Sequence, residues 1–171
     1  MLPKPQLDLF QLKEDELPAH SDLIGGSSCE RVMNCTGSVA LSKQMPPQPQ
    51  TKYMGEGTML HSVMEKCLNE EVEPWSLIGY EEAGCTLTKE LVEELADPAL
   101  NSFRTIKPLY GEIEFEIEAR VSYQDIDAFG TCDIVGFNDR YTIIIDWKFG
   151  RGVPVSAIDN HQLKFYAGAA R

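Results

Sequence analysis

Apolar and polar residues alternate strictly along the segment 112–121, EIEFEIEARV. Successive side chains of a β-strand point to opposite faces, so this pattern predicts a strand with one buried face and one solvated face. The apolar positions are Ile113, Phe115, Ile117, Ala119 and Val121, and the polar positions are Glu112, Glu114, Glu116, Glu118 and Arg120. We interpret the four glutamates as a solvated face rather than a metal site, because acidic residues on an exposed strand also deter aggregation.

Two more apolar, β-branched runs follow, GTCDIVG at residues 130–136 and IIIDWK at residues 143–148. The segment FNDRY at residues 137–141, which lies between them, has the composition of a hairpin turn. Pairing outward from this turn would bring Asp133 close to the level of Asp146. Together with the preceding segment, the two runs predict an antiparallel meander of three strands.

The spacing of apolar residues predicts four helices. Ser27 and Glu30 have the spacing of a capping box and open the first helix. Its buried stripe is expected to consist of Val32, Cys35 and Val39. The later helices are expected over about residues 51–71, 88–106 and 159–171, with a break or restart at Pro98 and a new cap at Asp97.

These elements predict an α+β fold, similar in layout to an α/β sandwich, in which helices cover a three-stranded meander. Residues 1–22 combine prolines, acidic residues and spaced leucines without a sustained period. We expect them to form a mobile N-terminal arm. Residues 23–171 are long enough for one domain with a core of its own.

The composition is typical of a globular protein, with 43% hydrophobic and 25% charged residues. No apolar run is long enough to span a membrane, and the first twenty residues lack the pattern of a signal peptide. We therefore expect a cytoplasmic protein with no membrane partner. The five cysteines include no C-x-x-C pair and are interpreted as reduced thiols.

The formal net charge of −12 limits how the protein can meet nucleic acid. Proteins that gain affinity by neutralising many phosphates are usually basic on at least one face. If nucleic acid is the partner, the few basic residues must gather near the site. Arg151 and Lys164 are the residues that we expect to bind it.

Candidate chemistry is concentrated in the two β-branched runs. Asp133 and Asp146 are hard oxygen ligands of the kind that suit Mg²⁺ or Mn²⁺. Lys148 would project from the same face as Asp146 and could stabilise negative charge on a phosphate. A D-x-K pattern also occurs by chance in strands, but an acid after three isoleucines needs a partner.

Two further positions could complete such a site. His61 borders the apolar face of a predicted helix, where a histidine is usually a satisfied core residue but can also take a metal position, favouring Mn²⁺. Gln162 and Tyr166 are four residues apart and share a helix face. Either could contact the lysine, a metal-bound water or a nucleotide.

The motifs G-x-x-x-H, G-T-x-D, D-x-K and Q-x-x-x-Y occur in this order. Together with residues 27–39 and 146–155, they resemble the RecB-like branch of the PD-(D/E)XK nuclease superfamily, and most of all an uncharacterised phage and prophage group within it. The resemblance implies a restriction-endonuclease-like core. It also implies a Mg²⁺ or Mn²⁺ site formed by His61, Asp133, Asp146 and the carbonyl of Trp147. Lys148 would be the catalytic lysine, and Gln162 and Tyr166 an accessory motif.

The sequence departs from this family pattern in two respects. Some relatives bind an iron–sulfur cluster through one cysteine near the first helix and three cysteines after the Gln/Tyr helix. Cys35 matches the first position, but no later cysteine follows, so we expect no cluster. The chain also stops at Arg171, before strands that commonly follow. We therefore expect a core trimmed at its C-terminus, with a sheet that another chain could complete.

Two hypotheses about the function remain open. The favoured one is a metal-dependent deoxyribonuclease, expected to be an exonuclease on single strands or duplex ends in phage replication, recombination or defence in the host cytoplasm. The alternative is a weak or inert nuclease-like scaffold that binds a host nuclease or a CRISPR protein. The acidic charge and the early end favour the scaffold, whereas the intact Asp/Asp/Lys set favours the enzyme. An acidic structural protein would require four motifs to coincide by chance.

Overall fold

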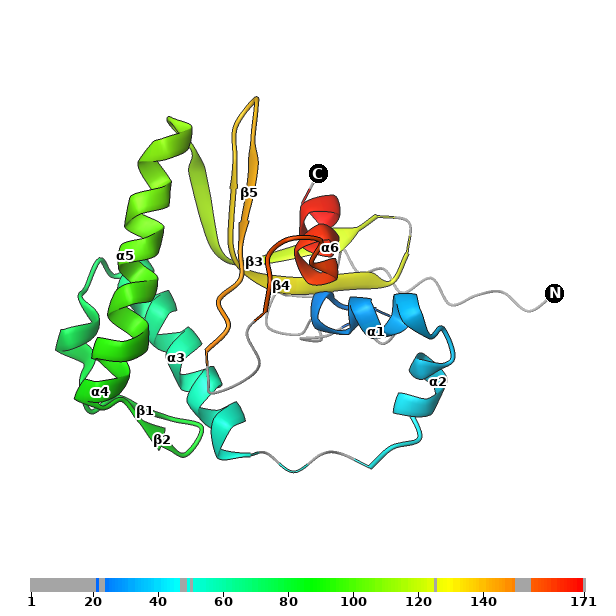
Figure 1. Ribbon diagram of the computed structural model, residues 1–171, viewed down its shortest axis with the longest axis horizontal. Coiled ribbons are helices and arrows are strands. Elements are labelled where there is room, and N and C mark those ends of the chain that lie inside the picture. The colour runs from blue at the N-terminus through cyan, green and yellow to red at the C-terminus, as the bar shows by residue number, and fades with distance from the viewer. Residues whose placement is uncertain are drawn as a thin grey trace, which may run out of the picture.

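The computed structural model describes residues 21, 24–46, 49, 51–124, 126–149 and 155–170. An antiparallel sheet with the strand order β3-β4-β5 is surrounded by helices, which confirms the predicted α+β class (Figure 1). The strands are β1 (Glu81–Glu82), β2 (Cys85–Thr86), β3 (Glu114–Tyr123), β4 (Ala128–Phe137) and β5 (Thr142–Ile145). The helical segments are η3 (Gly26–Ser28), α1 (Cys29–Asn34), α2 (Ser38–Ser42), α3 (Lys52–Asn69), η4 (Pro74–Leu77), α4 (Lys89–Leu91), η5 (Val92–Ala96), α5 (Asp97–Ile106), η6 (Lys107–Tyr110) and α6 (His161–Ala169). Of the expected arm at residues 1–22, the described part contains only Ser21.

The meander has a register that places acidic residues side by side. The last pair between β4 and β5 is Ile134 with Ile145, and one step further the same register sets Asp133 opposite Asp146. Because β5 is only four residues long, it covers just one end of β4. At the other end, Ala128 forms a parallel bridge with Ile24. Between these two contacts, one edge of β4 is not covered by another described strand.

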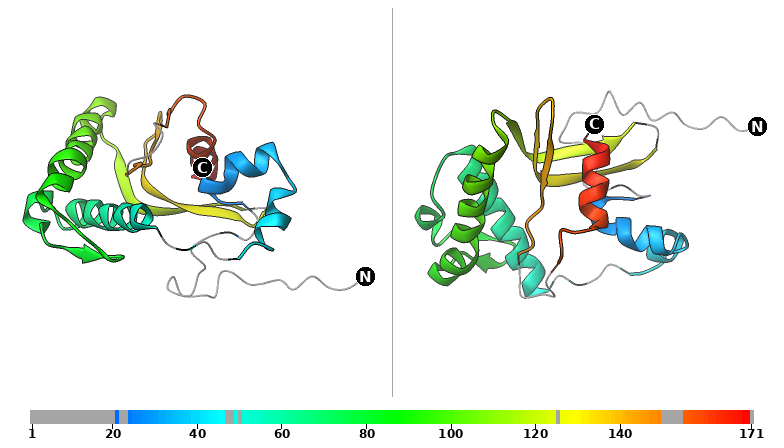
Figure 2. Two further views of the ribbon diagram at one scale, coloured as in Figure 1. Left: turned by 60° about the horizontal axis from the view of Figure 1, so that its bottom comes forward. Right: turned by 45° about the horizontal axis from the view of Figure 1, so that its top comes forward.

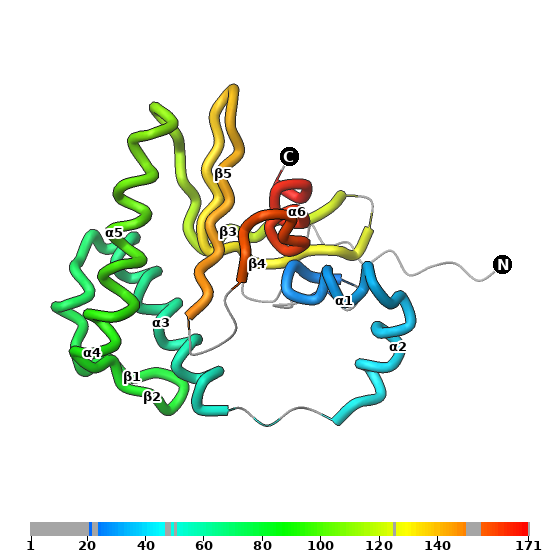
Figure 3. The backbone as a smooth tube through the Cα atoms, viewed as in Figure 1, coloured from blue at the N-terminus to red at the C-terminus, as the bar shows by residue number. Residues whose placement is uncertain are grey.

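Both long strands bend near their middle (Figure 3). At this point of β3, Glu118 has a φ of 51°, a left-handed conformation that is unfavourable for any residue except glycine. Before it, Phe115 faces α5, where the ring of Phe103 is 5.2 Å away. After it, Tyr123 faces α6 and meets the ring of Phe165 at 5.3 Å. The bend thus lets one strand pack against two different helices.

The core consists of two clusters. In Figure 2, helices α3 and α5, which carry one of them, lie on one side of the molecule, and α6, which carries part of the other, lies apart from them. The first joins α6 to the sheet and contains Cys29, Ala119, Val121, Ala128, Cys132, Val135, Phe165, Tyr166 and Ala169. The second joins α3 to α4, η5 and α5 and contains Met59, Leu60, Val63, Met64, Cys67, Leu87, Val92, Ala96 and Leu100. The functional site described below lies where elements from both clusters meet.

Helix α3 agrees closely with its prediction. The side chain of Thr51 accepts a hydrogen bond from the backbone N–H of Met54 at 3.3 Å and caps the first turn. Buried residues then recur every three or four positions, from Met59 to Cys67, as a one-sided helix requires. His61 follows the fully buried Leu60 and lies at the border of this apolar face.

The predicted break at Pro98 is wrong in detail. The chain runs without interruption from α4 through η5, a π-helical turn, into α5. Asp97 is the first residue of α5 rather than its cap, because the preceding Ala96 already has helical backbone angles. Proline is tolerated in the first turn of a helix, where its missing N–H costs least. The short β1–β2 hairpin, which the sequence analysis did not predict, turns at Ala83 and Gly84, both with positive φ.

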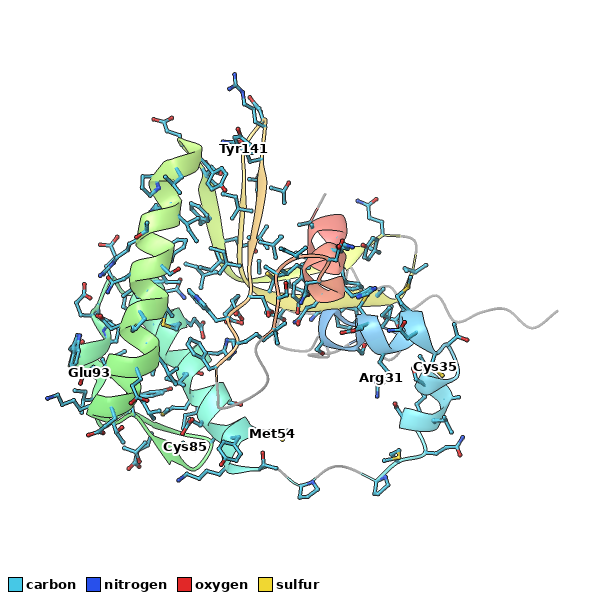
Figure 4. The ribbon with its side chains drawn as sticks, in the orientation of Figure 1. Arg31, Cys35, Met54, Cys85, Glu93 and Tyr141 are labelled. Carbon is cyan, nitrogen blue, oxygen red and sulfur yellow. The ribbon has the colours of Figure 1, made fainter. Side chains whose placement is uncertain are left out.

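The predicted start of the first helix is also wrong. Instead of Ser27 with Glu30, Ser28 forms the local contacts: the N–H of Gly25 donates to Ser28 Oγ at 3.0 Å. Helix α1 therefore begins only at Cys29, and that residue is buried. Cys35, expected in the buried stripe, is exposed on the α1–α2 side of the molecule (Figure 4). The last helix begins at His161, after Asn160 accepts a hydrogen bond from Leu163.

Among the described residues, no helix is both long enough and apolar enough to span a membrane.

The packing between β3 and β4 can be tested at Gly136. A Cβ atom at this position would lie 2.5 Å from the ring of Phe115 and 2.9 Å from Ile113. Gly136→Ala should therefore reduce the free energy of unfolding by about 1–3 kcal/mol, the usual cost of overpacking. Gly57→Ala is the matched control, because a Cβ there comes no nearer than 3.9 Å to another atom. Urea denaturation of both variants checks this, and equal midpoints would contradict the described packing.

Candidate metal and active site

A cavity of about 270 Å³ lies beside the uncovered edge of β4, near the point where β5 ends. Six residues that the sequence analysis singled out line it: His61, Asp133, Asp146, Lys148, Gln162 and Tyr166. The remaining wall consists of Gly25, Gly26, Ser27, Glu118, Gly130 and Thr131. The structure thus brings together motifs that are more than one hundred residues apart in the chain.

These six side chains come from four parts of the fold. His61 comes from α3, Asp133 from β4, and Gln162 and Tyr166 from α6. Asp146 and Lys148 follow β5 directly, so they leave the sheet at its end and turn toward the cavity. A rigid strand, two helices and a strand end therefore position the site, rather than a single loop.

Asp133 is the centre of one half of the site. Its side chain is 10% exposed, and its Oδ1 lies 3.1 Å from Nδ1 of His61. Its other oxygen accepts a hydrogen bond from the backbone N–H of Trp147 at 2.5 Å. The ring of Phe149 packs edge-on against His61, with the centroids 5.1 Å apart, and holds the imidazole in place.

Asp146 is the centre of the other half. Its side chain is 7% exposed and forms an ion pair with Lys148. Its Oδ1 accepts a hydrogen bond from Nε2 of Gln162 at 3.0 Å. The same nitrogen lies 3.1 Å from the hydroxyl of Tyr166. Lysine, aspartate, glutamine and tyrosine thus form one connected polar chain from β5 to α6.

Glu118 is the functional candidate that the sequence analysis missed. Its interpretation as part of a solvated face is wrong: Glu112, Glu114 and Glu116 are exposed, but Glu118 is half-buried and lines the cavity. Ligand atoms of His61, Glu118 and Asp133 all lie within 4.8 Å of one another, close enough to hold a metal ion. The alternation of residues 112–121 hides this, because only the left-handed backbone of Glu118 sets it apart from its neighbours.

Trp147 and Lys164 are described, but they are not among the residues that line the cavity. Trp147 contributes its backbone N–H to Asp133, and the predicted role of its carbonyl remains a prediction. Arg151 lies outside the described residues. Lys164 is exposed and bonded to Asp159 at 2.9 Å, so the structure does not place it on the cavity. The nucleic-acid contacts expected of Arg151 and Lys164 remain untested.

The crowding of acids shifts two pKa values in the first half of the site. Burial lowers the pKa of His61, but the hydrogen bond and charge of Asp133 more than offset this, so the pKa is raised overall. Burial and the charge of Asp133 raise the pKa of Glu118 to about 7. Near neutral pH this carboxyl group therefore holds a proton much of the time, and a cation would compete with that proton.

In the second half of the site, the pKa values of Asp146 and Tyr166 are also raised. Burial raises the pKa of Asp146, although the hydrogen bond and charge of Lys148 oppose the shift. Burial raises the pKa of Tyr166 to about 12, which keeps its hydroxyl protonated. Lys148 thus favours the ionised form of Asp146, which burial disfavours.

The residues fit a divalent cation of the hard or borderline class. Two carboxylates and one imidazole form a donor set that suits Mn²⁺ and accommodates Mg²⁺. A cluster of partly buried acids repels itself, and a cation relieves that repulsion. This fit rests on the donor atoms of His61, Glu118 and Asp133 and on their mutual distances.

Residues 20–171 match the model of a family described as "Protein of unknown function (DUF2800)". No solved structure matches the chain. The family description names no activity and no cofactor, so the resemblance to PD-(D/E)XK nucleases still depends on the motifs and the cavity.

The raised pKa of Glu118 predicts how stability depends on pH in metal-free protein. The folded state keeps the proton up to about pH 7, whereas the unfolded chain loses it near pH 4.5. This contribution to stability is present at low pH and is lost as the pH rises through 7. Discounted for partial exposure, it should amount to about 1–2 kcal/mol.

Denaturant titrations in EDTA between pH 5 and pH 8 measure this slope. Glu118→Gln should flatten it, whereas Glu116→Gln, on the exposed part of the same strand, should leave it unchanged. Parallel curves for the wild type and Glu118→Gln would show that Glu118 does not titrate in this way.

Proposed function

The chain belongs to the DUF2800 family, and for it we propose a divalent-metal-dependent nuclease activity that hydrolyses phosphodiester bonds in DNA. One observation carries the proposal: a metal-capable triad of His61, Glu118 and Asp133 shares a cavity with the ion pair of Asp146 and Lys148. A cation site beside a positioned lysine promotes phosphodiester hydrolysis, because both stabilise negative charge that develops on the phosphate.

The metal would be held by the imidazole of His61 and the carboxylates of Glu118 and Asp133. When bound, Mg²⁺ or Mn²⁺ polarises a phosphate and lowers the pKa of a water molecule beside it. The protein keeps two of the donors in place: Phe149 supports the ring of His61, and the N–H of Trp147 holds one oxygen of Asp133.

Lys148 would stabilise negative charge on the phosphate. Its side chain is half-exposed, with 47% of its surface accessible, so a substrate can reach it. Asp146 holds the ammonium group at the cavity wall, and Gln162 in turn fixes Asp146. A preorganised cation of this kind costs little reorganisation when charge develops on the substrate.

The scarcity of basic residues limits how a nucleic acid could bind to the protein. Lys148 is the only lysine or arginine among the described residues that line the cavity, and the chain carries a net charge of −12. Such a surface disfavours binding along a long duplex. We therefore propose that single strands or duplex ends enter the cavity, as an exonuclease of phage or prophage origin would require. A cytoplasmic site of action is part of this proposal.

The same scarcity of basic residues supports one alternative. A weak or inert scaffold that binds a host nuclease or a CRISPR protein would need no phosphate-binding surface. A partner or a second copy that pairs with the sheet edge would fit this role. Nuclease assays with Mg²⁺ or Mn²⁺ on single-stranded, duplex and RNA substrates separate the two functions, because the scaffold would cut none of them.

Lys148→Ala tests the enzyme directly. Lys148 is a cation and contributes little to metal binding, so the variant should keep its stabilisation by Mn²⁺ while its cleavage rate falls by on the order of a hundredfold or more. Asp133→Asn should lose both properties, since Asp133 belongs to the metal-capable triad. Cleavage of a labelled oligonucleotide and thermal melting with Mn²⁺ or EDTA provide the two measurements. Unchanged cleavage by Lys148→Ala would remove the lysine from the mechanism.

A further inference from the structure

Tyr166 forms part of the cavity wall at a point where three segments of the chain meet. It belongs to α6 and is only 4% exposed. The short helix η3, near the N-terminal end of the described chain, contacts both α6 and β4. Helix α1, which follows η3 directly, lies beside α6 (Figure 1). The phenol ring is therefore enclosed by elements that are far apart in the sequence.

Two glycines leave the room that this ring occupies. A Cβ atom at Gly26, in η3, would collide with the ring carbons Cε1 and Cζ of Tyr166 and lie 2.6 Å from its hydroxyl oxygen. A Cβ atom at Gly130, in β4, would lie 3.2 Å from Cε1 and 3.3 Å from the backbone nitrogen of Gly26. Because protein interiors are close-packed, a side chain at position 26 would displace the ring. The backbone at Gly26 thus fixes where the hydroxyl group lies.

The hydroxyl group of Tyr166 in turn fixes the side chain of Gln162. Nε2 of Gln162 donates to this hydroxyl oxygen at 3.1 Å and to Oδ1 of Asp146 at 3.0 Å. A primary amide has two N–H hydrogens, so these two bonds use both of them and set the orientation of the amide plane. Asp146 then forms the ion pair with Lys148. A displacement of the phenol ring is therefore passed on to the lysine.

This path to Lys148 does not pass through the metal-capable triad. The triad has supports of its own, since the ring of Phe149 packs against its histidine and the N–H of Trp147 binds its aspartate. A change at Gly26 should therefore disturb the lysine and leave the metal-binding groups in place.

We propose that Gly26 is a positioning residue, which sets the place of the Lys148 ammonium group through the hydrogen-bonded side chain of Tyr166. The inference rests on the proposed nuclease function and makes the N-terminal turn a part of the apparatus that aligns the reacting groups. Misplacement of such a group by about 1 Å lowers a rate by on the order of a hundredfold. A single methyl group at position 26 is expected to have an effect of this size.

Cleavage of a labelled single-stranded oligonucleotide with Mn²⁺ tests the inference. Gly26→Ala should lower kcat by about a hundredfold, leave KM within about twofold of the parent, and keep the rise in melting temperature that Mn²⁺ produces. Gly37→Ala is the matched control in the neighbouring turn, because a Cβ atom there comes no nearer than 3.9 Å to another group. The control should match the parent in all three quantities.

Tyr166→Phe separates positioning from a general loss of packing. This substitution removes the hydroxyl group and keeps the ring, so it breaks the path at its next step. If Gly26 acts through that hydroxyl group, the double variant with Gly26→Ala should cut no more slowly than the slower of the two single variants. Losses that multiply in the double variant would show an independent structural effect and would overturn the inference.

The side-chain amide of Gln162 reports the same path without any cleavage. Its two N–H signals in a nitrogen–proton NMR correlation spectrum, identified by their absence from Gln162→Leu, should exchange slowly with water in the parent protein in EDTA. Gly26→Ala and Tyr166→Phe should each shift these signals and speed their exchange, because one hydrogen loses its acceptor. Unchanged amide signals in Gly26→Ala would contradict the proposed path.

The outcomes distinguish the inference from the proposed function. If Gly26→Ala does not fold, Gly130→Ala presses more mildly on the same ring and should show the same pattern with a smaller loss of kcat. A parent protein that cuts no faster than Gly26→Ala would remove the inference alone. A parent protein that cuts no nucleic acid would remove the proposed function and with it the role of Lys148, even if the NMR signals confirm that Gly26 holds Gln162 in place.

Discussion

The carboxylates of Glu118, Asp133 and Asp146 lie in one row across the sheet. The repulsion among their negative charges must be offset by the residues packed around them. Glu118 lies between the paired residues Ile117 and Ala119 of β3, at the level of Asp133 on β4, and Asp146 follows the last paired residue of β5. Like charges this close and this buried destabilise one another unless cations or donors compensate. His61 and Lys148 supply part of that compensation from α3 and from the end of β5. No hydrogen bond or ion pair to Glu118 is seen within the described part of the chain, and burial and the charge of Asp133 raise its pKa to about 7 although the charge of His61 opposes the shift. A bound divalent cation would supply the missing charge.

The fold makes this row possible by bending the sheet at that level. The left-handed backbone of Glu118 costs conformational energy that only the surrounding packing can offset. Phe115 packs against α5 on one side of the bend, and Tyr123 packs against α6 on the other. The two clusters of the core thus hold the two halves of the strand, and the strained residue between them faces the cavity. Strain of this kind is typical of functional sites.

Much of the fold follows from local patterns in the sequence. The alternation in residues 112–121, the hairpin after β4 and the one-sided helix α3 each reflect a periodicity that burial enforces over many residues. The same patterns, with the four ordered motifs, identify His61, Asp133, Asp146, Lys148, Gln162 and Tyr166, which share one cavity. Glu118 could not be found this way, because its side chain departs from the alternation through a single backbone angle. The predicted helix start at Ser27 is wrong because the neighbouring Ser28, rather than Ser27, forms the local hydrogen bond, in which it accepts from the N–H of Gly25.

The central claim is that His61, Glu118 and Asp133 together hold a divalent cation. The most direct measurement is anomalous X-ray diffraction from crystals grown or soaked with MnCl₂. We predict one strong manganese peak within coordination distance of His61 and of both carboxylates. No peak at this position, or a peak bound by Asp133 and Asp146 without His61 and Glu118, would contradict the account.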